Sequence, residues 1–338
     1  MFDKYSNKGL SGMANLGNTC FINSCMQVLS HTYELNDLLN KDTSINKNIE
    51  GVLLSEWNKL RQLLWSENCT VSPQGWLRGI QLVALKKNKD IFTGYAQNDL
   101  PEFLLFILDC FHGGLKRKVN MEIKGDIKTN SDKIAKKCYE MIVEMYEKEY
   151  SEIIDLFMGV HISQIISQDG FILSNRPEPF FTLDLPIPSD NKNPNIYDCL
   201  NLYSEPEKLE GENAWFNEET NKKENVYRRI TYWKPPDILI IALKRFNNSG
   251  RKIQTLIDFP IENFDFSNYL YSSNEKPLYD LYGICNHSGG TMGGHYTAFC
   301  KNANNLWYLF NDTHVSQVND ISKIVSTQAY CLFYRKKK

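Results

Sequence analysis

The stretch that decides the fold reads Gly12-Met13-Ala14-Asn15-Leu16-Gly17-Asn18-Thr19-Cys20-Phe21-Ile22-Asn23-Ser24. Apolar residues that follow its cysteine recur at the spacing i, i+3, i+4 and i+7, namely Ile22, Cys25, Met26 and Leu29. This spacing is typical of an amphipathic helix with one buried face. Asn18 and Thr19 are suited to cap its first N–H groups. The sequence therefore predicts a helix that begins at Cys20.

A cysteine at the start of a helix is a candidate nucleophile. The thiolate is the reactive form, and the dipole and free N–H groups of a helix N-terminus favour that anion. The alternative is a small buried apolar residue, the usual role of a free cysteine.

The nine cysteines are odd in number and scattered, which indicates reduced thiols inside a cell rather than a disulfide framework. With no C-x-x-C pair and no histidine pair at ligand spacing, we expect no metal and no other cofactor.

A second candidate lies far along the chain, in the segment Ser288-Gly289-Gly290-Thr291-Met292-Gly293-Gly294-His295-Tyr296. Here a glycine-rich loop delivers His295 to the start of a predicted strand, and glycine allows another backbone to approach closely. The histidine is a candidate general base. The alternative is an ordinary surface or core histidine.

A catalytic imidazole needs a third group that orients it, and Asn311 and Asp312 lie at the end of the next predicted strand. If residues 302–305 form a four-residue turn, His295 falls opposite Asp312. One extra turn residue or a bulge is expected to bring Asn311 opposite instead. Both candidates stay open, beside the alternative of a simple strand-end turn, where Asn and Asp are common.

The remaining pattern predicts helices first and strands later. A second helix is expected at Asp99, which has capping-box spacing to Glu102 and is followed by Pro101. A third is expected over residues 132–150. From about Phe180 the sequence favours short β-strands.

Within this β-rich part, residues 208–224 are expected to form a loop or an exposed hairpin tip. Short connections predict antiparallel strands, and the fold class is therefore α+β. The predicted strands cover residues 237–246, 280–287, 295–301, 306–311 and 329–335.

Composition excludes several classes of protein. In 338 residues, 38 basic and 40 acidic side chains give a formal charge of −2, so no global field favours nucleic acid or an anionic membrane. The hydrophobic fraction of 42% is that of a globular protein. The longest aliphatic run, residues 238–243, is far below the roughly 20 residues of a membrane span. The first residues lack the apolar stretch of a signal peptide, so we expect an intracellular protein, cytoplasmic or nuclear.

Residues 12–24 resemble the Cys box of the ubiquitin-specific proteases. Residues 293–298 followed by 307–312 resemble the His box of the same family, in the right order along the chain. Three further segments are similar to family motifs between these boxes: residues 94–104, 184–188 and 236–246. The resemblance extends from about residue 9 to residue 335.

This resemblance implies a papain-like cysteine protease with thumb, palm and fingers. It implies a single catalytic domain over residues 1–338. The mainly helical thumb is expected at about residues 9–155, and the antiparallel β palm and fingers at about residues 156–335.

Site roles follow from the resemblance residue by residue. It implies that Cys20 is the nucleophile, His295 the base and Asn311 the orienting group, with Asp312 as a possible secondary catalytic residue. Asn15 matches the amide that stabilises the oxyanion, a role that neutral amide donors suit, although its position equally fits a loop cap.

The resemblance also implies a binding site for the ubiquitin tail. Asp99 matches an acid that meets this basic tail, and its capping-box position gives it a structural role as well. Gly293, Gly294 and Tyr296 are expected to line the channel that the tail enters.

One departure from the family pattern concerns zinc. Many members hold zinc at the fingertips with two C-x-x-C pairs. Here residues 161–170 contain no cysteine, and Asn217 and Thr220 stand where the second pair is expected. We therefore expect fingers held by strand pairing without a metal.

The predicted activity is that of a deubiquitinating thiol protease. It hydrolyses the peptide or isopeptide bond after the C-terminal glycine of ubiquitin through an acyl-enzyme on Cys20. The expected partners are ubiquitin and ubiquitinated proteins, with the enzyme as a monomer. Two alternatives are a ubiquitin-binding scaffold without activity and a peptidase for another modifier with a Gly-Gly tail.

Overall fold

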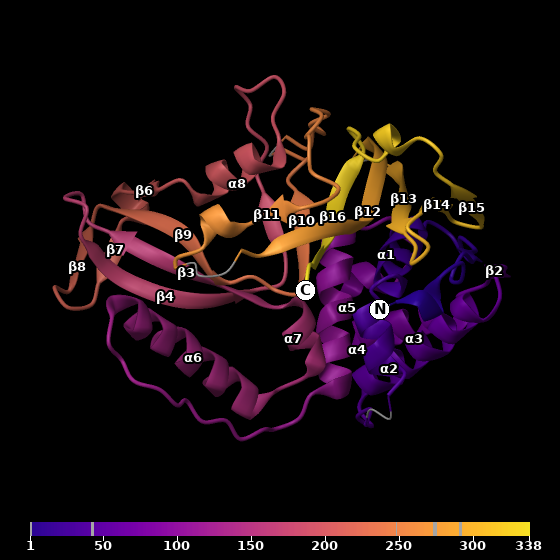
Figure 1. Cartoon of the computed structure of the whole chain (residues 1–338), viewed down its shortest axis with the longest axis horizontal. Helices are drawn as coiled ribbons and strands as arrows, with labels where there is room; N and C mark the ends of the chain where they lie inside the picture. Colours follow the sequence, from indigo (N-terminus) through magenta and orange to yellow (C-terminus); the bar gives the residue numbers. More distant parts are fainter. Residues whose placement is uncertain (1, 42–43, 248, 273–275, 291–292) are drawn as a thin grey trace.

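In the computed structural model, helices occupy the first part of the chain and strands the second (Figure 1). The structure describes residues 2–41, 44–247, 249–272, 276–290 and 293–338. The helices that precede the first long strand are α1 (Cys20–Ser30), α2 (Tyr33–Leu39), α3 (Ile49–Ser66), α4 (Gln74–Lys86), α5 (Leu100–Leu115), α6 (Asn130–Lys148) and α7 (Glu152–Phe157).

The central sheet has the strand order β15-β14-β13-β12-β16-β10-β5, with β11 paired to β12. Its pairs are antiparallel except for β10 with β5, which is parallel. The strands are β5 (Leu183–Leu185), β10 (Ile238–Leu243), β11 (Phe264–Asp265), β12 (Leu278–Gly290), β13 (Gly293–Lys301), β14 (Trp307–Asn311), β15 (His314–Gln317) and β16 (Ala329–Lys336). The five strands predicted from the sequence are confirmed, with shifted ends.

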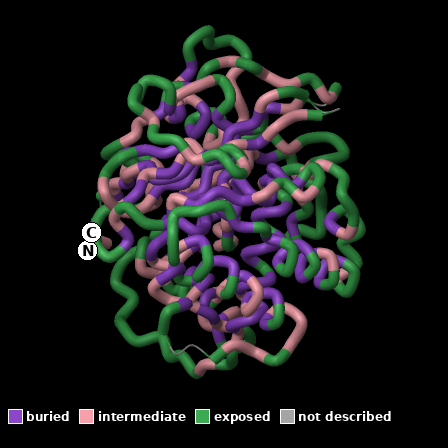
Figure 2. The backbone as a smooth tube through the Cα atoms, turned by 90° about the vertical axis from the view of Figure 1, so that its right-hand side faces the viewer, coloured by how far each residue is buried: buried purple, intermediate pink, exposed green. Residues whose placement is uncertain are grey.

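The middle of this sheet is covered on both faces. Along β10, Ile238 and Ile240 pack in the core that the thumb helices share. Leu239 and Ile241 point the other way, into a second core that includes helix α8 (Ile196–Ser204). The two sets alternate because successive side chains in a strand point to opposite faces. Figure 1 shows α8 and α5 on opposite sides of the sheet, and Figure 2 shows the buried chain gathered between exposed outer loops.

A second sheet extends away from the first, with the order β4-β3-β9-β6 (Figure 1). Helix α6 lies along it and buries Ile134, Cys138 and Ile142 against Val160 and Ile162. A separate hairpin lies at the end of this second sheet that is remote from the central sheet (Figure 1). The strands are β3 (Gly159–Ile166), β4 (Ile172–Phe180), β6 (Glu207–Leu209) and β9 (Val226–Lys234), and the hairpin is β7 (Trp215–Asn217) with β8 (Lys222–Glu224).

The strands begin earlier than the sequence indicated. Phe180 was expected near the start of the β-rich part, but it is the last residue of β4. Pro177 and Pro179 obscure this strand in the sequence, yet β4 is an edge strand, where a missing N–H is tolerated. The prediction of a hairpin within residues 208–224 is confirmed by β7 and β8.

Two capping predictions are wrong, although both helices form. The Asp99 side chain makes no cap hydrogen bond to α5 and instead accepts one from the Tyr330 hydroxyl at 2.6 Å. At α1, the Thr19 hydroxyl accepts a bond from the backbone N–H of Leu16. Asn18 donates to the carbonyl of Tyr95. These side chains make other contacts and do not cap the first N–H groups of the two helices.

Helix α6 confirms the third predicted helix and begins two residues before it. Thr129 and Asp132 form a capping box, in which each side chain accepts a hydrogen bond from the backbone of the other residue. In the part of the chain that the structure describes, no helix combines the length and the apolar character needed to cross a bilayer.

His31 directly follows α1 and is fully buried. Its Nδ1 donates to the carbonyl of Gln27 at 2.8 Å, and its Nε2 has no hydrogen-bond partner. Burial lowers the pKa of His31 to about 4, and the nearby charge of Arg335 adds to this effect. The imidazole is therefore neutral in the folded protein at pH 7.

We expect His31 to make folding stability fall as the pH drops from 7 to 4.5. Below about pH 6.5 the unfolded chain protonates this residue, whereas the folded chain does not until about pH 4. In urea unfolding at both pH values, His31→Gln should reduce the pH-dependent loss by about 2 kcal/mol. The exposed His314→Gln is the control, and an unchanged loss in His31→Gln contradicts this prediction.

Candidate active site

Cys20 is the first residue of α1, and only 3% of it is exposed. Its Sγ accepts a hydrogen bond from the side-chain amide of Gln97, with Nε2 at 3.5 Å. Between the described residues Cys20 and His295 no hydrogen bond is formed. The thiol therefore lies at a helix start, as the sequence predicted, with an amide as its donor.

His295 lies near the start of β13 and contacts the end of β14. Its Nε2 is 2.7 Å from Oδ1 of Asn311. Because that oxygen can only accept, Nε2 carries the proton in this contact, and in the neutral ring Nδ1 is the basic nitrogen. The histidine and Asn311 are thus brought together, as the resemblance implied.

The strand register differs from both alternatives considered for the sequence. Lys301 pairs with Trp307 and Ala298 with Phe310, so five residues separate the paired positions. The turn thus has one residue more than the four considered first. In this register Asn311 lies beside Thr297, whereas an extra turn residue was expected to place it opposite His295. Residues two apart in a strand share a face, and Asn311 reaches His295 diagonally from beside Thr297.

Asp312 contacts the loop before α1 and the start of that helix. Its Oδ1 accepts a bond from Nδ2 of Asn23 at 2.7 Å, and its Oδ2 accepts one from Nδ2 of Asn15 at 3.0 Å. Its backbone carbonyl accepts from the N–H of Met13 at 2.8 Å. The expectation that a four-residue turn puts Asp312 opposite His295 is wrong, because Asp312 holds the loop before α1 and the first turns of that helix.

Asn15 lies in this loop, and its amide is held at both ends. Its Oδ1 accepts bonds from the backbone N–H groups of Gly17 and Thr19, each at 3.1 Å. Its Nδ2 donates one hydrogen to Asp312. The role as a loop cap is therefore present, and the second hydrogen of Nδ2 remains for another acceptor.

A cavity of about 310 Å³ opens beside Gln97, the residue that contacts Cys20. Asp99, Tyr296 and His287 line it together with Gln97, Phe246 and Tyr330. Burial raises the pKa of Tyr296 and Tyr330, and it lowers the pKa of His287 to about 4, with a further lowering by Lys252. Desolvation also raises the pKa of Asp99, although solvent still reaches this residue. The histidine in this cavity wall is therefore neutral at pH 7.

Gln97 and His287 were missed as site residues by the sequence reasoning. Gln97 stands two residues before Asp99, inside a segment that the resemblance marked, but a loop glutamine has no periodicity that reveals its contacts. His287 ends a predicted strand and reads as a core residue.

The glycine-rich hairpin between β12 and β13 requires small residues at specific positions. Gly289 has a φ of 98° and pairs with Gly294. A Cβ on Gly294 would lie 2.3 Å from Nε2 of His287 and 2.4 Å from the carbonyl oxygen of Ser288. The predicted channel residues Gly293 and Gly294 are described, whereas residues 291–292 of this loop lie outside the described residues.

The fingertip residues do not fit zinc. Asn217 donates from Nδ2 to Oε1 of Glu224 at 3.0 Å, and the Thr220 hydroxyl donates to the same oxygen at 2.6 Å. Neither side chain supplies the thiolate or imidazole that zinc prefers. Among the described residues, no group of three or more His, Cys, Asp or Glu side chains is placed to hold a metal.

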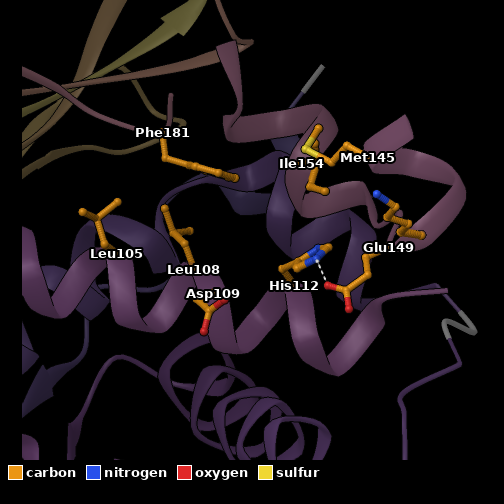
Figure 3. A pocket seen from close by; sticks show the side chains of 9 residues that line it. Leu105, Leu108, Asp109, His112, Met145, Glu149, Ile154 and Phe181 are labelled. Carbon is orange, nitrogen blue, oxygen red and sulfur yellow. Dashed lines mark ion pairs between the residues drawn. The ribbon is translucent and has the colours of Figure 1, made fainter. Parts of the chain in front are cut away.

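A separate cavity of about 390 Å³ lies between α5, α6 and α7 (Figure 3). Leu105, Leu108 and Phe181 contribute to its apolar wall. His112 and Glu149 lie at its polar side, with Nε2 of the histidine 3.6 Å from Oε2 of the glutamate. It contains none of the predicted site residues.

We expect Gly294→Ala to lower the melting temperature, because the new Cβ meets a backbone oxygen that cannot move freely. The matched control is Gly290→Ala in the same hairpin, where a Cβ meets nothing within 4 Å. Thermal unfolding should show a drop of several degrees for Gly294→Ala, which corresponds to about 2 kcal/mol in a chain of this size, and little change for the control. Equal melting temperatures would contradict the close approach.

Known proteins are similar to this chain in sequence and in fold. A family model described as ubiquitin carboxyl-terminal hydrolase matches residues 11–334. Ubiquitin carboxyl-terminal hydrolase 2 of Homo sapiens is 34% identical over 343 residues, which cover 97% of this chain and 55% of the human protein. The chain thus spans about half the length of that relative. The Gallus gallus protein of the same name is 36% identical over 344 residues, which cover 97% of this chain and 93% of that protein.

Solved structures of similar chains have the same fold. The SAGA DUB module of Ubp8, Sgf11, Sus1 and Sgf73 bound to monoubiquitin contains a chain with a TM-score of 0.76 and 25% identity, covering 98% of this chain and 70% of that one. The same module bound to ubiquitin aldehyde gives a TM-score of 0.75, also at 25% identity, covering 99% and 71%. The fold is the α+β, papain-like fold of these enzymes, and the chain belongs to the ubiquitin carboxyl-terminal hydrolase family, among the ubiquitin-specific proteases.

Proposed function

We propose that this protein is a deubiquitinating thiol protease that cleaves the peptide or isopeptide bond after the C-terminal glycine of ubiquitin. The observation that carries the proposal is the pairing of His295 with Asn311 beside the helix that begins at Cys20, in a chain of this family. The ubiquitin-bound structures of similar chains support the substrate.

The proposed reaction begins with proton transfer from the Cys20 thiol to Nδ1 of His295. The thiolate then attacks the carbonyl carbon of the ubiquitin glycine and forms a tetrahedral intermediate. Its oxyanion accepts a hydrogen bond from the remaining N–H of Asn15. His295 returns the proton to the leaving amine, while Asn311 keeps the ring oriented. Water, deprotonated by His295, hydrolyses the thioester and releases ubiquitin.

The ubiquitin tail is proposed to enter past the cavity beside Asp99. The Asp99 carboxylate, which accepts from Tyr330, is the acid available to a basic tail. Gly293, Gly294 and Tyr296 form the proposed channel wall. Glycine at Gly293 and Gly294 allows another backbone to approach this wall closely, which favours a Gly-Gly tail.

Several further assignments remain proposals. They are a single domain over residues 1–338, with a thumb to about residue 155 and palm and fingers after it. The protein is proposed to act as a monomer on ubiquitinated proteins in the cytoplasm or nucleus. The near balance of acidic and basic residues supports a function without nucleic acid or membrane binding.

One observation favours the alternative of a ubiquitin-binding scaffold, since no hydrogen bond joins the described Cys20 and His295. The scaffold hypothesis requires that ubiquitin binds, that a ubiquitin C-terminal reporter is never cleaved, and that no adduct forms on Cys20 with an electrophilic ubiquitin probe. The protease hypothesis requires cleavage and an adduct on Cys20. Parallel reporters built on other modifiers with Gly-Gly tails test the remaining alternative.

We expect hydrolysis of a ubiquitin C-terminal reporter to rank the site residues. Cys20→Ser and His295→Ala should lower kcat/KM about 1,000-fold or more, because each removes a reacting group. Asn311→Ala should cost about 100-fold through loss of ring orientation, and Asp312→Ala about tenfold through a loosened Asn15.

The control for this series is Asn191→Ala, in an exposed loop far along the chain from these residues. Circular dichroism and melting temperature should verify that each variant is folded. A larger loss for Asp312→Ala than for Asn311→Ala would overturn the assigned orienting residue, and full activity of Cys20→Ser would overturn the mechanism.

A further inference from the structure

Gln97 joins the segments that carry Cys20 and His295. It lies in the loop that follows the short helix η2 (Asp90–Phe92) and precedes α5. Its Oε1 accepts from the backbone N–H of Gly294 at 2.8 Å, and its Nε2 donates to the carbonyl of the same residue at 2.5 Å. The same Nε2 lies 3.5 Å from Sγ of Cys20. One side chain therefore contacts the nucleophile candidate and the residue that precedes His295.

The chemistry of a primary amide accounts for all three contacts. The amide has two N–H hydrogens and one accepting oxygen, and its oxygen and one hydrogen close a two-way bond with the Gly294 peptide. The second hydrogen then remains for the sulfur. A hydrogen bond of this kind strengthens when the acceptor becomes an anion, so it favours the thiolate over the thiol.

The position of this contact also constrains geometry. Gly294 pairs with Gly289 in the β12–β13 hairpin, so its peptide is part of a paired strand. Cys20 belongs to α1, which is a different element packed against β13. A rigid amide between the two fixes how far the Cys20 sulfur lies from the strand that holds His295.

We propose that Gln97 donates a hydrogen bond that stabilises the Cys20 thiolate and sets the distance between Cys20 and His295. The inference rests on the proposed function for its catalytic meaning, but the contact with sulfur can be tested without ubiquitin. His295 and Tyr296, the neighbouring titratable groups on β13, stay unchanged in every variant, so a difference reports on Gln97.

The test is the pH dependence of Cys20 alkylation by iodoacetamide, followed by mass spectrometry of the Cys20 peptide in the full chain. In Gln97→Leu, which keeps the size but removes both donors, the pH midpoint of alkylation should rise by about one unit, and the rate at pH 7 should fall about tenfold. Gln97→Glu, nearly identical in shape, should raise the midpoint at least as much because its carboxylate repels a thiolate.

Two controls accompany these variants. Cys69, which is exposed, is alkylated in the same samples and should keep its profile in every variant. Gln62→Leu makes the same substitution on the exposed side of α3 and should leave the Cys20 profile unchanged. Melting temperatures identify any variant that fails to fold, and Gln97→Glu keeps the test valid if Gln97→Leu does not fold.

Reporter hydrolysis separates the two parts of the inference. We expect kcat to fall in both variants with little change in KM. Midpoints within about 0.2 pH units of the wild type would overturn the role of Gln97, whether or not ubiquitin is cleaved. A wild-type protein without reporter activity but with the expected shift in Gln97→Leu would overturn the proposed function alone.

Discussion

The last residue of β14 and the residue that follows it form the constraint on which the site depends. Asn311 and Asp312 are neighbours, but their side chains act on different segments: one contacts His295, and the other binds the loop and helix that carry Asn15 and Cys20. Asn311 ends the strand, whereas Asp312 lies in the following turn with a φ of 49°, and this change of backbone conformation lets one turn position both halves of the site. The order of the two residues therefore matters as much as their identity.

Around this turn, backbone atoms of the segment before α1 contact backbone atoms of the segment after β14 directly. The Met13 N–H bonds to the carbonyl of Asp312, and Gly12 leaves room for Thr313 to approach. The site is thus assembled from segments about 300 residues apart in sequence, and its geometry is determined by the central sheet. Such long-range assembly requires the palm strands to form before the site can exist.

Much of this arrangement could be predicted from the sequence because it follows from local patterns. The helix at Cys20 follows from hydrophobic periodicity, the strand β10 from its β-rich aliphatic run, and the α+β class from the order of helices and strands. The register between β13 and β14 could not be predicted, since one residue in a turn changes every pairing along the ladder. The same limit applies to Asp99, Asn18 and Gln97, whose partners lie in distant segments that no local pattern identifies.

The fingertip hairpin has a consequence for the chemical robustness of the protein. Where relatives of this family use thiolates and zinc, Glu224 here gathers donors from Asn217 and Thr220. These contacts join an amide, a hydroxyl and a carboxylate, so no thiol takes part in them. The hydrogen bonds of this hairpin therefore do not depend on the oxidation state of a sulfur atom, in contrast to the thiol chemistry at Cys20.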